Sequence, residues 1–298
     1  MSVLLLFIDG IGIGSFDIDS NPFARFPSPY FSFFSDSQTL DIPHDGILIV
    51  TDPTMQVKGL PQSATGQTAL FTGKKASQIL GRHHSGFPTP TLRQLIKKES
   101  IFLQIENLGG TGTFANALSQ KYLQRPPRQI SASTWSILAS NFPLRMVEKE
   151  LMEDQAISHD LTNEFLHRTG YKVPLRTPQE SAEILAQITE SVDFCLFEFI
   201  LTDLVGHKKD MARAAEIVEK LHRFLQTLLK QLDLKQHLVI LTSDHGNFEN
   251  LNVSTHTYNP VPTILWGRGA SSLHASIKAI EDITPAIVRF LQNQKTNG

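Results

Sequence analysis

A short apolar run that ends in Ser-Asp-His-Gly constrains this chain more than any other feature. Residues 237–242 form a β-branched, hydrophobic stretch that is typical of a buried strand. Asp244, His245 and Gly246 follow almost at once, so a carboxylate and an imidazole are predicted at the C-terminal end of that strand. In α/β sheets this edge is where ligands bind. We therefore expect Asp244 and His245 to lie in a binding site.

Two further apolar runs are predicted strands that end in aspartate. They are residues 3–8, followed by Asp9, and residues 192–203, which end in Asp203. Three histidines lie close to these strand ends in the sequence: His207, His245 and His256. Aspartates and histidines gathered at one sheet edge supply the oxygen and nitrogen donors of a divalent metal. The pattern therefore predicts a metal site.

Composition narrows the class of protein. A chain of 298 residues with 41% hydrophobic residues can bury a full core, and we expect one domain over residues 1–298. The net charge of −2 gives no electrostatic basis for binding nucleic acid or an anionic membrane. No apolar run approaches membrane-spanning length, and we recognise no signal peptide. The single cysteine, Cys195, suits a reducing compartment, so a cytoplasmic protein is expected.

Strands and helices alternate along the rest of the chain. Further strands are predicted at residues 46–51, 101–105 and 262–266, and helices at residues 61–73, 89–98, 178–190, 209–232 and 283–292. Residues from about 120 to 177 have a mixed, proline-interrupted pattern that predicts a small cap-like insertion. The alternation implies an α/β fold with a largely parallel central sheet and helices on both faces.

The predicted helix that begins near Ser63 offers a place for phosphate. Free backbone N–H groups and the helix dipole favour an anion at such an end. Ser63 is equally suited to be an ordinary N-cap, and Thr65 and Thr68 are alternative hydroxyls. A second glycine-containing stretch, residues 10–14, frees the backbone to approach a ligand but lacks the spacing of a dinucleotide fingerprint.

Taken together, these segments resemble the alkaline phosphatase superfamily, in particular the branch of cofactor-independent phosphoglycerate mutase and phosphopentomutase. The matching segments are Phe7-Ile-Asp9-Gly10, Gln62-Ser63 with Gly66, Asp203 with Gly206-His207, Ser243-Asp244-His245-Gly246-Asn247, and His256 with Asn259-Pro-Val-Pro262. They run from the first strand to the last in the order found in that family. The resemblance implies that fold and a metal-dependent phosphoryl-transfer activity.

The resemblance also implies a role for each predicted ligand. One divalent ion would be held by Asp9, Ser63, Asp244 and His245, and a second by Asp203, His207 and His256. We expect manganese, with zinc as the alternative, because this donor set suits both ions. Ser63 would be the nucleophile that forms a phosphoserine intermediate, since two ions about 3.5–4 Å apart clamp the entering and leaving oxygens of an in-line displacement.

Differences from the typical family sequence favour one type of reaction over the others. Gln67 stands where the mutases usually carry histidine, and no sulfatase motif surrounds Ser63. The mutases also carry a sizeable extra domain, whereas here only residues 120–177 could cover the site. We therefore predict a phosphomonoesterase acting on a small phosphorylated metabolite, with a phosphomutase or a phosphodiesterase as alternatives. A protein that kept the fold but lost turnover is disfavoured, because the complete donor set is present.

Basic residues near these motifs are candidates for contact with an anionic substrate. They are Arg82, His83, His84, Lys208 and Lys209. For each of them a solvated surface position is the simpler interpretation. The sequence predicts no oligomeric state and no macromolecular partner.

Overall fold

A six-stranded sheet with strand order β2-β6-β5-β1-β4-β3 forms the centre of the protein. The computed structural model describes residues 1–36 and 41–296. The strands are β1 (Val3–Ile8), β2 (Ile47–Thr51), β3 (Gly112–Phe114), β4 (Phe194–Phe199), β5 (Leu238–Thr242) and β6 (Val261–Gly267). All neighbouring strands are parallel except at β6, which runs against both β5 and β2. The expected largely parallel sheet is confirmed.

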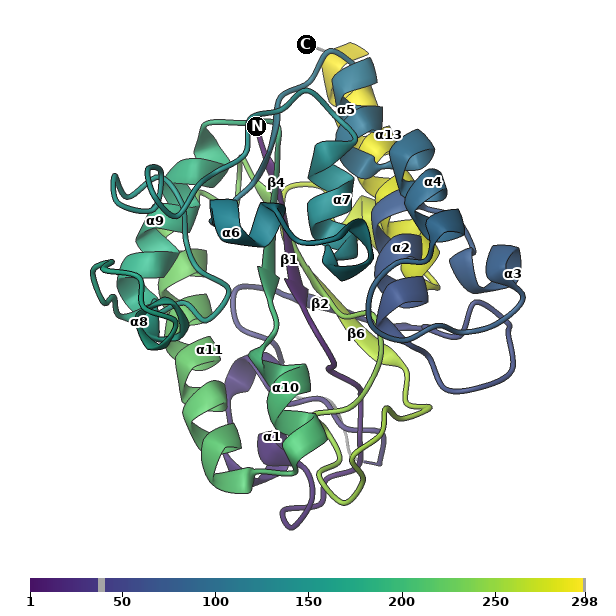
Figure 1. Cartoon of the computed structure of the whole chain (residues 1–298). Coiled ribbons are helices and arrows are strands. Elements are labelled where there is room, and N and C mark those ends of the chain that lie inside the picture. Colours follow the sequence, from purple (N-terminus) through teal and green to yellow (C-terminus); the bar gives the residue numbers. More distant parts are fainter. Residues whose placement is uncertain (37–40, 297–298) are drawn as a thin grey trace.

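Helices cover both faces of the sheet (Figure 1). The α-helices are α1 (Pro22–Arg25), α2 (Ser63–Thr72), α3 (Ala76–Leu80), α4 (Pro90–Glu99), α5 (Ile101–Asn107), α6 (Gln120–Leu123), α7 (Ala132–Leu138), α8 (Glu164–Arg168), α9 (Pro178–Glu190), α10 (Leu201–Lys208), α11 (Met211–Gln231), α12 (Ala270–His274) and α13 (Ile283–Thr296). Three 3-10 helices are η1 (Pro29–Phe31), η2 (Pro127–Gln129) and η3 (Ile280–Asp282). None of the described helices is both long and apolar enough to cross a membrane.

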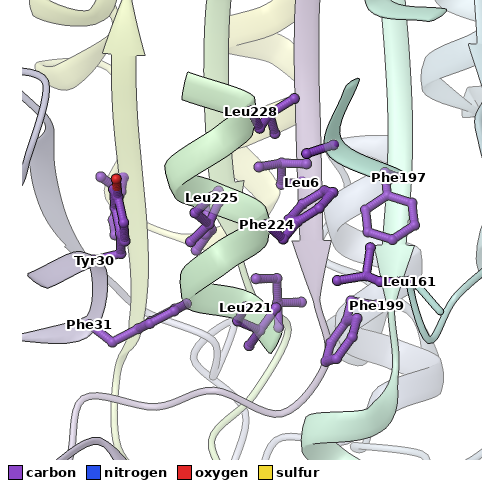
Figure 2. Packing of buried hydrophobic residues seen from close by; sticks show 14 of the residues in the cluster. Leu6, Tyr30, Phe31, Leu161, Phe197, Phe199, Leu221, Phe224, Leu225 and Leu228 are labelled. Carbon is purple, nitrogen blue, oxygen red and sulfur yellow. The ribbon is translucent and has the colours of Figure 1, made fainter. Parts of the chain in front are cut away.

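The alternation of side chains along β1 divides the core into two layers. Leu4, Leu6 and Ile8 belong to the layer under α9 and α11, where Phe224 and the leucines of α11 pack against β1 and β4 (Figure 2). Val3, Leu5 and Phe7 belong to the opposite layer, under α2, α5 and α13. Since each buried side chain of this size contributes about 1.5–3 kcal/mol, the two layers fix the sheet between them. The C-terminal ends of β1, β4 and β5 are therefore held at one edge.

Two expectations about strands were wrong. Residues 101–105 belong to helix α5, whose N-cap Ser100 accepts a hydrogen bond from the Phe102 N–H at 3.2 Å. The apolar residues there satisfy a helical spacing as well as a strand pattern, and the serine cap selects the helix. Asp203 does not end a strand either, because β4 stops at Phe199. Asp203 lies in the first turn of α10 and shares one side of that helix with His207, four residues later.

Residues 120–177 are divided between the sheet layer and a small cluster of their own. Ala132 and Ile137 of α7 join the core layer that contains α2 and α5. A separate buried cluster holds Val147, Leu151, Ala156, Leu166 and Val173. The expectation that residues 120–177 include a small cap over the site stays a prediction.

Candidate metal centre

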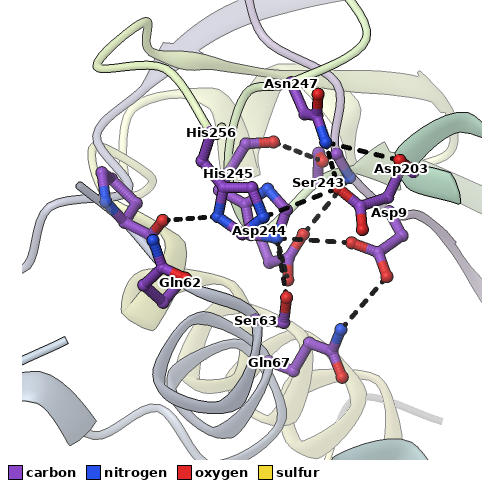
Figure 3. Close-up of polar contacts among 12 residues, drawn as sticks. Asp9, Gln62, Ser63, Gln67, Asp203, Ser243, Asp244, His245, Asn247 and His256 are labelled. Carbon is purple, nitrogen blue, oxygen red and sulfur yellow. Dashed lines mark hydrogen bonds and ion pairs between the residues drawn. The ribbon is translucent and has the colours of Figure 1, made fainter. Parts of the chain in front are cut away.

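Four predicted ligands meet around one nitrogen of His245 (Figure 3). Nε2 of His245 lies 3.0 Å from Oγ of Ser63, 3.4 Å from Oδ2 of Asp244 and 3.5 Å from Oδ1 of Asp9. Asp9 follows β1, Asp244 and His245 follow β5, and Ser63 begins α2, so three separate segments supply the group. One imidazole nitrogen makes a single hydrogen bond, whereas a cation accepts all four atoms as ligands.

The other three predicted ligands form a second group beside the first. Nε2 of His207 lies 3.2 Å from Asp203 Oδ2 and 3.3 Å from Nε2 of His256, which is 3.7 Å from Asp203 Oδ1. Both histidines are oriented by backbone carbonyls, since Nδ1 of His207 is 2.8 Å from Ser254 O and Nδ1 of His256 is 2.8 Å from Pro61 O. When each imidazole is neutral in this orientation, its Nε2 lone pair is directed into the group, as metal-binding histidines require.

The two groups are in contact through stacked imidazoles. The rings of His245 and His256 have centroids 3.6 Å apart and an interplanar angle of 15°. His245 offers a donor atom within 4.8 Å of those of Asp9 and Asp244, and equally within 4.8 Å of those of Asp203 and His256. The structure thus brings together all seven side chains that the sequence suggested as ligands.

Negative charge is concentrated at this edge of the sheet. Burial, together with the charge of Asp203, raises the pKa of Asp244 to about 8. Burial and the neighbouring charges of Asp244, Asp203 and Glu198 raise the pKa of Asp9 well above its ordinary value. Burial also raises the pKa of Glu198, on β4, to about 7. Without a compensating cation the protein must either protonate these carboxyls or bear their repulsion.

Unpaired polar atoms support the assignment of a cation site. Among the described residues, Oδ1 of Asp9, Oδ2 of Asp244 and Nδ1 of His245 are buried without a hydrogen-bond partner. Leaving buried polar atoms unpaired costs roughly 1–3 kcal/mol each, and more for charged groups. Two of these atoms are carboxylate oxygens that face His245 Nε2. Carboxylate, imidazole and hydroxyl donors suit manganese or zinc, so the residues fit the divalent ions expected from the sequence.

Ser63 is the hydroxyl that faces the donors. It is the first residue of α2 and is half-buried, and Gln62, not Ser63, occupies the N-cap position without making a side-chain cap. Thr65 and Thr68 are fully buried, and their hydroxyls donate to the carbonyls of Gln62 and Ala64 at 3.1 and 2.6 Å. The alternative hydroxyls are therefore engaged within the helix, while Ser63 Oγ points to His245.

Two other residues of α2, Gln67 and Gly66, lie close to the candidate ligands Asp9 and Asp244. Gln67, one turn further along α2, donates from Nε2 to Asp9 Oδ2 at 3.4 Å. The residue that replaces the family's histidine is therefore directed at a predicted ligand. A Cβ on Gly66 would lie 2.9 Å from the Asp244 carbonyl oxygen, so the helix approaches the β5 loop as closely as a glycine allows.

The basic residues proposed from the sequence as substrate contacts lie in two different parts of the structure. The backbone of His84 pairs with Thr65 through Thr65 N–H to His84 O at 3.3 Å and His84 N–H to Thr65 Oγ1 at 3.2 Å. The loop of Arg82, His83 and His84 is thereby held beside the N-terminus of α2. Lys208 and Lys209 lie exposed at the end of α10.

Two residues that organise the centre, Asn247 and Glu249, had no role predicted from the sequence. Asn247 donates to Asp203 Oδ1 at 2.6 Å and so fixes one oxygen of that carboxylate. Glu249 lies behind the ligand loops and accepts hydrogen bonds from several of them. Asn247 was visible as part of a motif, whereas the clue to Glu249 is the unusual number of glycines around it.

Part of the chain is similar in sequence to known metalloenzymes. Residues 164–295 match the family model described as Metalloenzyme superfamily. That segment contains the predicted ligands Asp203, His207, Asp244, His245 and His256. A 2,3-bisphosphoglycerate-independent phosphoglycerate mutase from Moorella thermoacetica is 29% identical over 131 residues, which cover 41% of this chain and 25% of the mutase. The match thus spans about a quarter of the length of that relative.

The fold as a whole is shared with solved structures. A cold-active alkaline phosphatase from Shewanella sp. superposes with a TM-score of 0.58 at 12% identity, covering 98% of this chain and 100% of that chain. The PH0037 protein from Pyrococcus horikoshii superposes with a TM-score of 0.60 at 14% identity, covering 98% and 97% of the two chains.

The chain shares the fold of solved alkaline phosphatases, and residues 164–295 match the Metalloenzyme superfamily model, in line with the family that the sequence motifs resemble. Within that superfamily, the sequence of the C-terminal part is similar to that of the cofactor-independent phosphoglycerate mutases.

Proposed function

We propose that the protein is a two-metal phosphomonoesterase that acts on a small phosphorylated metabolite through a phosphoserine at Ser63. The observation that carries the proposal is the position of Ser63 Oγ, at the N-terminus of α2 and 3.0 Å from His245 Nε2. A hydroxyl, a helix N-terminus and a set of divalent-metal donors meet there. Each of them assists phosphoryl transfer to serine: the hydroxyl attacks, the helix N-terminus favours the phosphate, and bound metal ions would activate the hydroxyl.

Two groups of residues would hold the ions. Asp9, Ser63, Asp244 and His245 would bind one ion, and Asp203, His207 and His256 the other, with manganese preferred over zinc. When bound, such ions favour the serine alkoxide and neutralise charge on the transferred phosphoryl group. Gln67 and Asn247 orient Asp9 and Asp203 for this task through their hydrogen bonds.

The reaction then divides into two displacements at phosphorus. Ser63 Oγ forms a bond to phosphorus as the bond to the substrate's ester oxygen breaks, and that oxygen leaves as an alcohol after gaining a proton. A water then attacks the phosphoserine, inorganic phosphate leaves, and Ser63 regains its hydroxyl proton. In the first step the phosphoryl oxygens accept hydrogen bonds from N–H groups at the start of α2, which Gln62 does not cap with its side chain. The Thr65 N–H is not among them, because it already donates to the His84 carbonyl.

Access for water favours hydrolysis over transfer within one substrate. Ser63 is half-buried, and the side chain of His207 is 42% exposed. Between α2 and β4, the chain forms α3 to α9 and β3, part of which packs into the sheet layers. A mutase must keep water from its phosphoserine while the substrate reorients, and closing domains serve that purpose. The alkaline phosphatase whose whole chain superposes on this one supports the same choice.

A phosphomutase is the second candidate, and the observation that favours it is the sequence similarity to phosphoglycerate mutase. A phosphodiesterase is compatible with the same donors. We also infer a cytoplasmic location, supported by the single buried cysteine, Cys195.

Phosphorus NMR separates these activities. The protein is supplied with Mn²⁺ and incubated with phosphoglycerates, with pentose phosphates and with an aryl phosphate, and Ser63→Ala serves as the control. Release of inorganic phosphate by the unmodified protein alone is the expected result. Clean interconversion of positional isomers without phosphate release would show a mutase and overturn the proposal.

A further inference from the structure

Glu249 is a buried carboxylate behind the metal centre that the proposed reaction does not use. Its side chain is only 1% exposed. Oε2 accepts hydrogen bonds from the backbone N–H groups of Gly12 and Asn247, each at 2.8 Å. Oε1 accepts from the Thr257 hydroxyl and from Asn259 Nδ2, the latter at 2.9 Å. Each oxygen thus accepts two hydrogen bonds, which fix the position of the carboxylate.

These donors come from segments that carry predicted metal ligands. Gly12 is three residues after Asp9, and Thr257 directly follows His256. Glu249 therefore links the loop after β1 to the loop before β6. It acts together with two backbone hydrogen bonds between the same loops, from Phe248 N–H to Gly10 O and from Ile13 N–H to Pro260 O, each at 2.8 Å.

Asn247 connects Glu249 to α10, which carries Asp203, and to the loop that carries His245. Its backbone N–H binds Glu249, its side chain donates to Asp203 Oδ1 at 2.6 Å, and it follows His245 by two residues (Figure 3). Every segment that supplies a ligand to the second group therefore connects to Glu249 directly or through Asn247.

The glycines around the centre make room for Glu249. A Cβ on Gly12 or on Gly246 would overlap Oε1 of Glu249, and a Cβ on Gly14 would lie 2.8 Å from its Cγ. The glycines of residues 10–14 suggested a backbone that approaches a ligand. In the structure, Gly12 and Gly14 instead approach a side chain of the same protein.

We propose that Glu249 is a positioning residue whose carboxylate holds the loops of Asp9, His245 and His256 in the arrangement that binds the divalent ions. The inference rests on the proposed two-metal centre, but it concerns metal affinity and not turnover. Groups that orient metal ligands from behind commonly change metal affinity or activity by about 10- to 100-fold when they are replaced.

Binding of Mn²⁺ alone tests this role. Glu249→Gln keeps the size of the side chain but replaces one acceptor oxygen with an NH₂ group that faces two donors. We expect its Mn²⁺ dissociation constant, measured by titration calorimetry, to rise at least about 10-fold. Excess Mn²⁺ should restore much of the lost phosphatase activity, which a defect in folding would not allow.

Asp160→Asn is a matched control. Asp160 is also a buried carboxyl that accepts several hydrogen bonds, from Ser158 Oγ, Asn163 N–H and Phe165 N–H at 2.6, 3.0 and 2.7 Å. All these donors lie within five residues of Asp160, in the loop before α8 and in the first turn of that helix. Its replacement should lower thermal stability and leave the Mn²⁺ dissociation constant unchanged.

The outcomes are distinct. Equal Mn²⁺ affinity in the unmodified protein and Glu249→Gln overturns the inference, as does an equal loss in Asp160→Asn. Should Glu249→Gln fail to fold, Asn259→Ala removes one hydrogen bond to Oε1 and is expected to weaken Mn²⁺ binding by a smaller factor; unchanged affinity there overturns the inference too. Failure of the unmodified protein to bind Mn²⁺ would refute the two-metal centre itself, and with it this role.

Discussion

His207 and His256 direct their Nε2 atoms at one another across 3.3 Å, and both rings are held in this orientation by backbone carbonyls. Two lone pairs at this separation repel unless a cation lies beside them. In the metal-free protein that cation is a proton, because the hydrogen bond to Asp203 raises the pKa of His207 to about 9 despite its partial burial. A divalent ion must displace the proton in order to bind.

Metal binding should therefore release protons at neutral pH. Below about pH 9 the His207 proton competes with the metal, so the apparent Mn²⁺ affinity should rise with pH up to that value. Calorimetric titrations in buffers of different ionisation enthalpy count the protons released. Asp244, whose pKa is raised to about 8, should contribute as well. His207→Ala should release fewer protons than the unmodified protein, and equal release would contradict this assignment.

Thermal stability of the metal-free protein should fall as the pH rises. The pKa values of Asp244 and Glu198 are raised from 3.8 to about 8 and from 4.5 to about 7, mainly by burial. A carboxyl with a raised pKa in the folded state stabilises the fold fully below its unfolded pKa and loses that contribution as the pH passes the folded value. Melting temperatures of the chelated protein should decrease between about pH 5 and about pH 8. With Mn²⁺ present the decrease should be smaller, because the ion compensates the charge; a pH-independent melting temperature without metal would contradict the argument.

Replacing Ser63 with alanine should abolish turnover and leave the fold intact. Loss of an attacking group costs several orders of magnitude in rate, while the second metal site does not involve Ser63. Acid quenching during turnover, followed by peptide mass analysis, should find phosphate on the peptide that contains Ser63. Thr65→Val and Thr68→Val are controls in the same helix, since their hydroxyls bind backbone carbonyls. Phosphate on either threonine would show that the wrong hydroxyl was assigned.

Substitutions in the two ligand groups should empty different sites. Asp203→Asn is expected to lower the metal content by about one ion per chain, because it removes a ligand of the second group. Asp244→Asn is expected to cause the same loss by removing a ligand of the first group. His245→Ala should weaken both, because its ring lies between the groups. Metal analysis after dialysis measures the content directly. Two retained ions in any of these variants would exclude that residue as a ligand.

Gly66→Ala should impair catalysis more than stability. The new Cβ would lie 2.9 Å from the Asp244 carbonyl oxygen, so α2 and the β5 loop must separate by a few tenths of an ångström. Ser63 moves with α2, and small displacements of a nucleophile lower the rate by up to about 100-fold. Ala69→Gly in the same helix is the control, since it costs about 1 kcal/mol of helix propensity without approaching Asp244. Equal activity losses in the two variants would contradict a specific effect of the contact.

The sequence by itself determined the layered α/β fold and suggested which residues gather at the candidate metal centre. Buried strands such as β1 and β5 are continuous apolar runs, and the amphipathic pattern of α11 is long enough to identify it as a helix. The candidate ligands could be proposed because polar residues directly after such strands often belong to a binding site. The local residue pattern is enough to predict these strands, helices and candidate ligands, whichever distant segments they contact.

Only the tertiary structure decided how those residues act together. Residues 101–105 fit a strand or a helix until the cap at Ser100 and the packing of α5 are known. Asp203 and His207 lie on one face because α10 places them one helical turn apart. If the same segment were a β-strand, the two side chains would lie too far apart to bind one ion. The link through Glu249 joins Gly12 to residues more than two hundred positions away in the chain. Such contacts depend on the meeting of distant segments, and no local pattern specifies which segments meet.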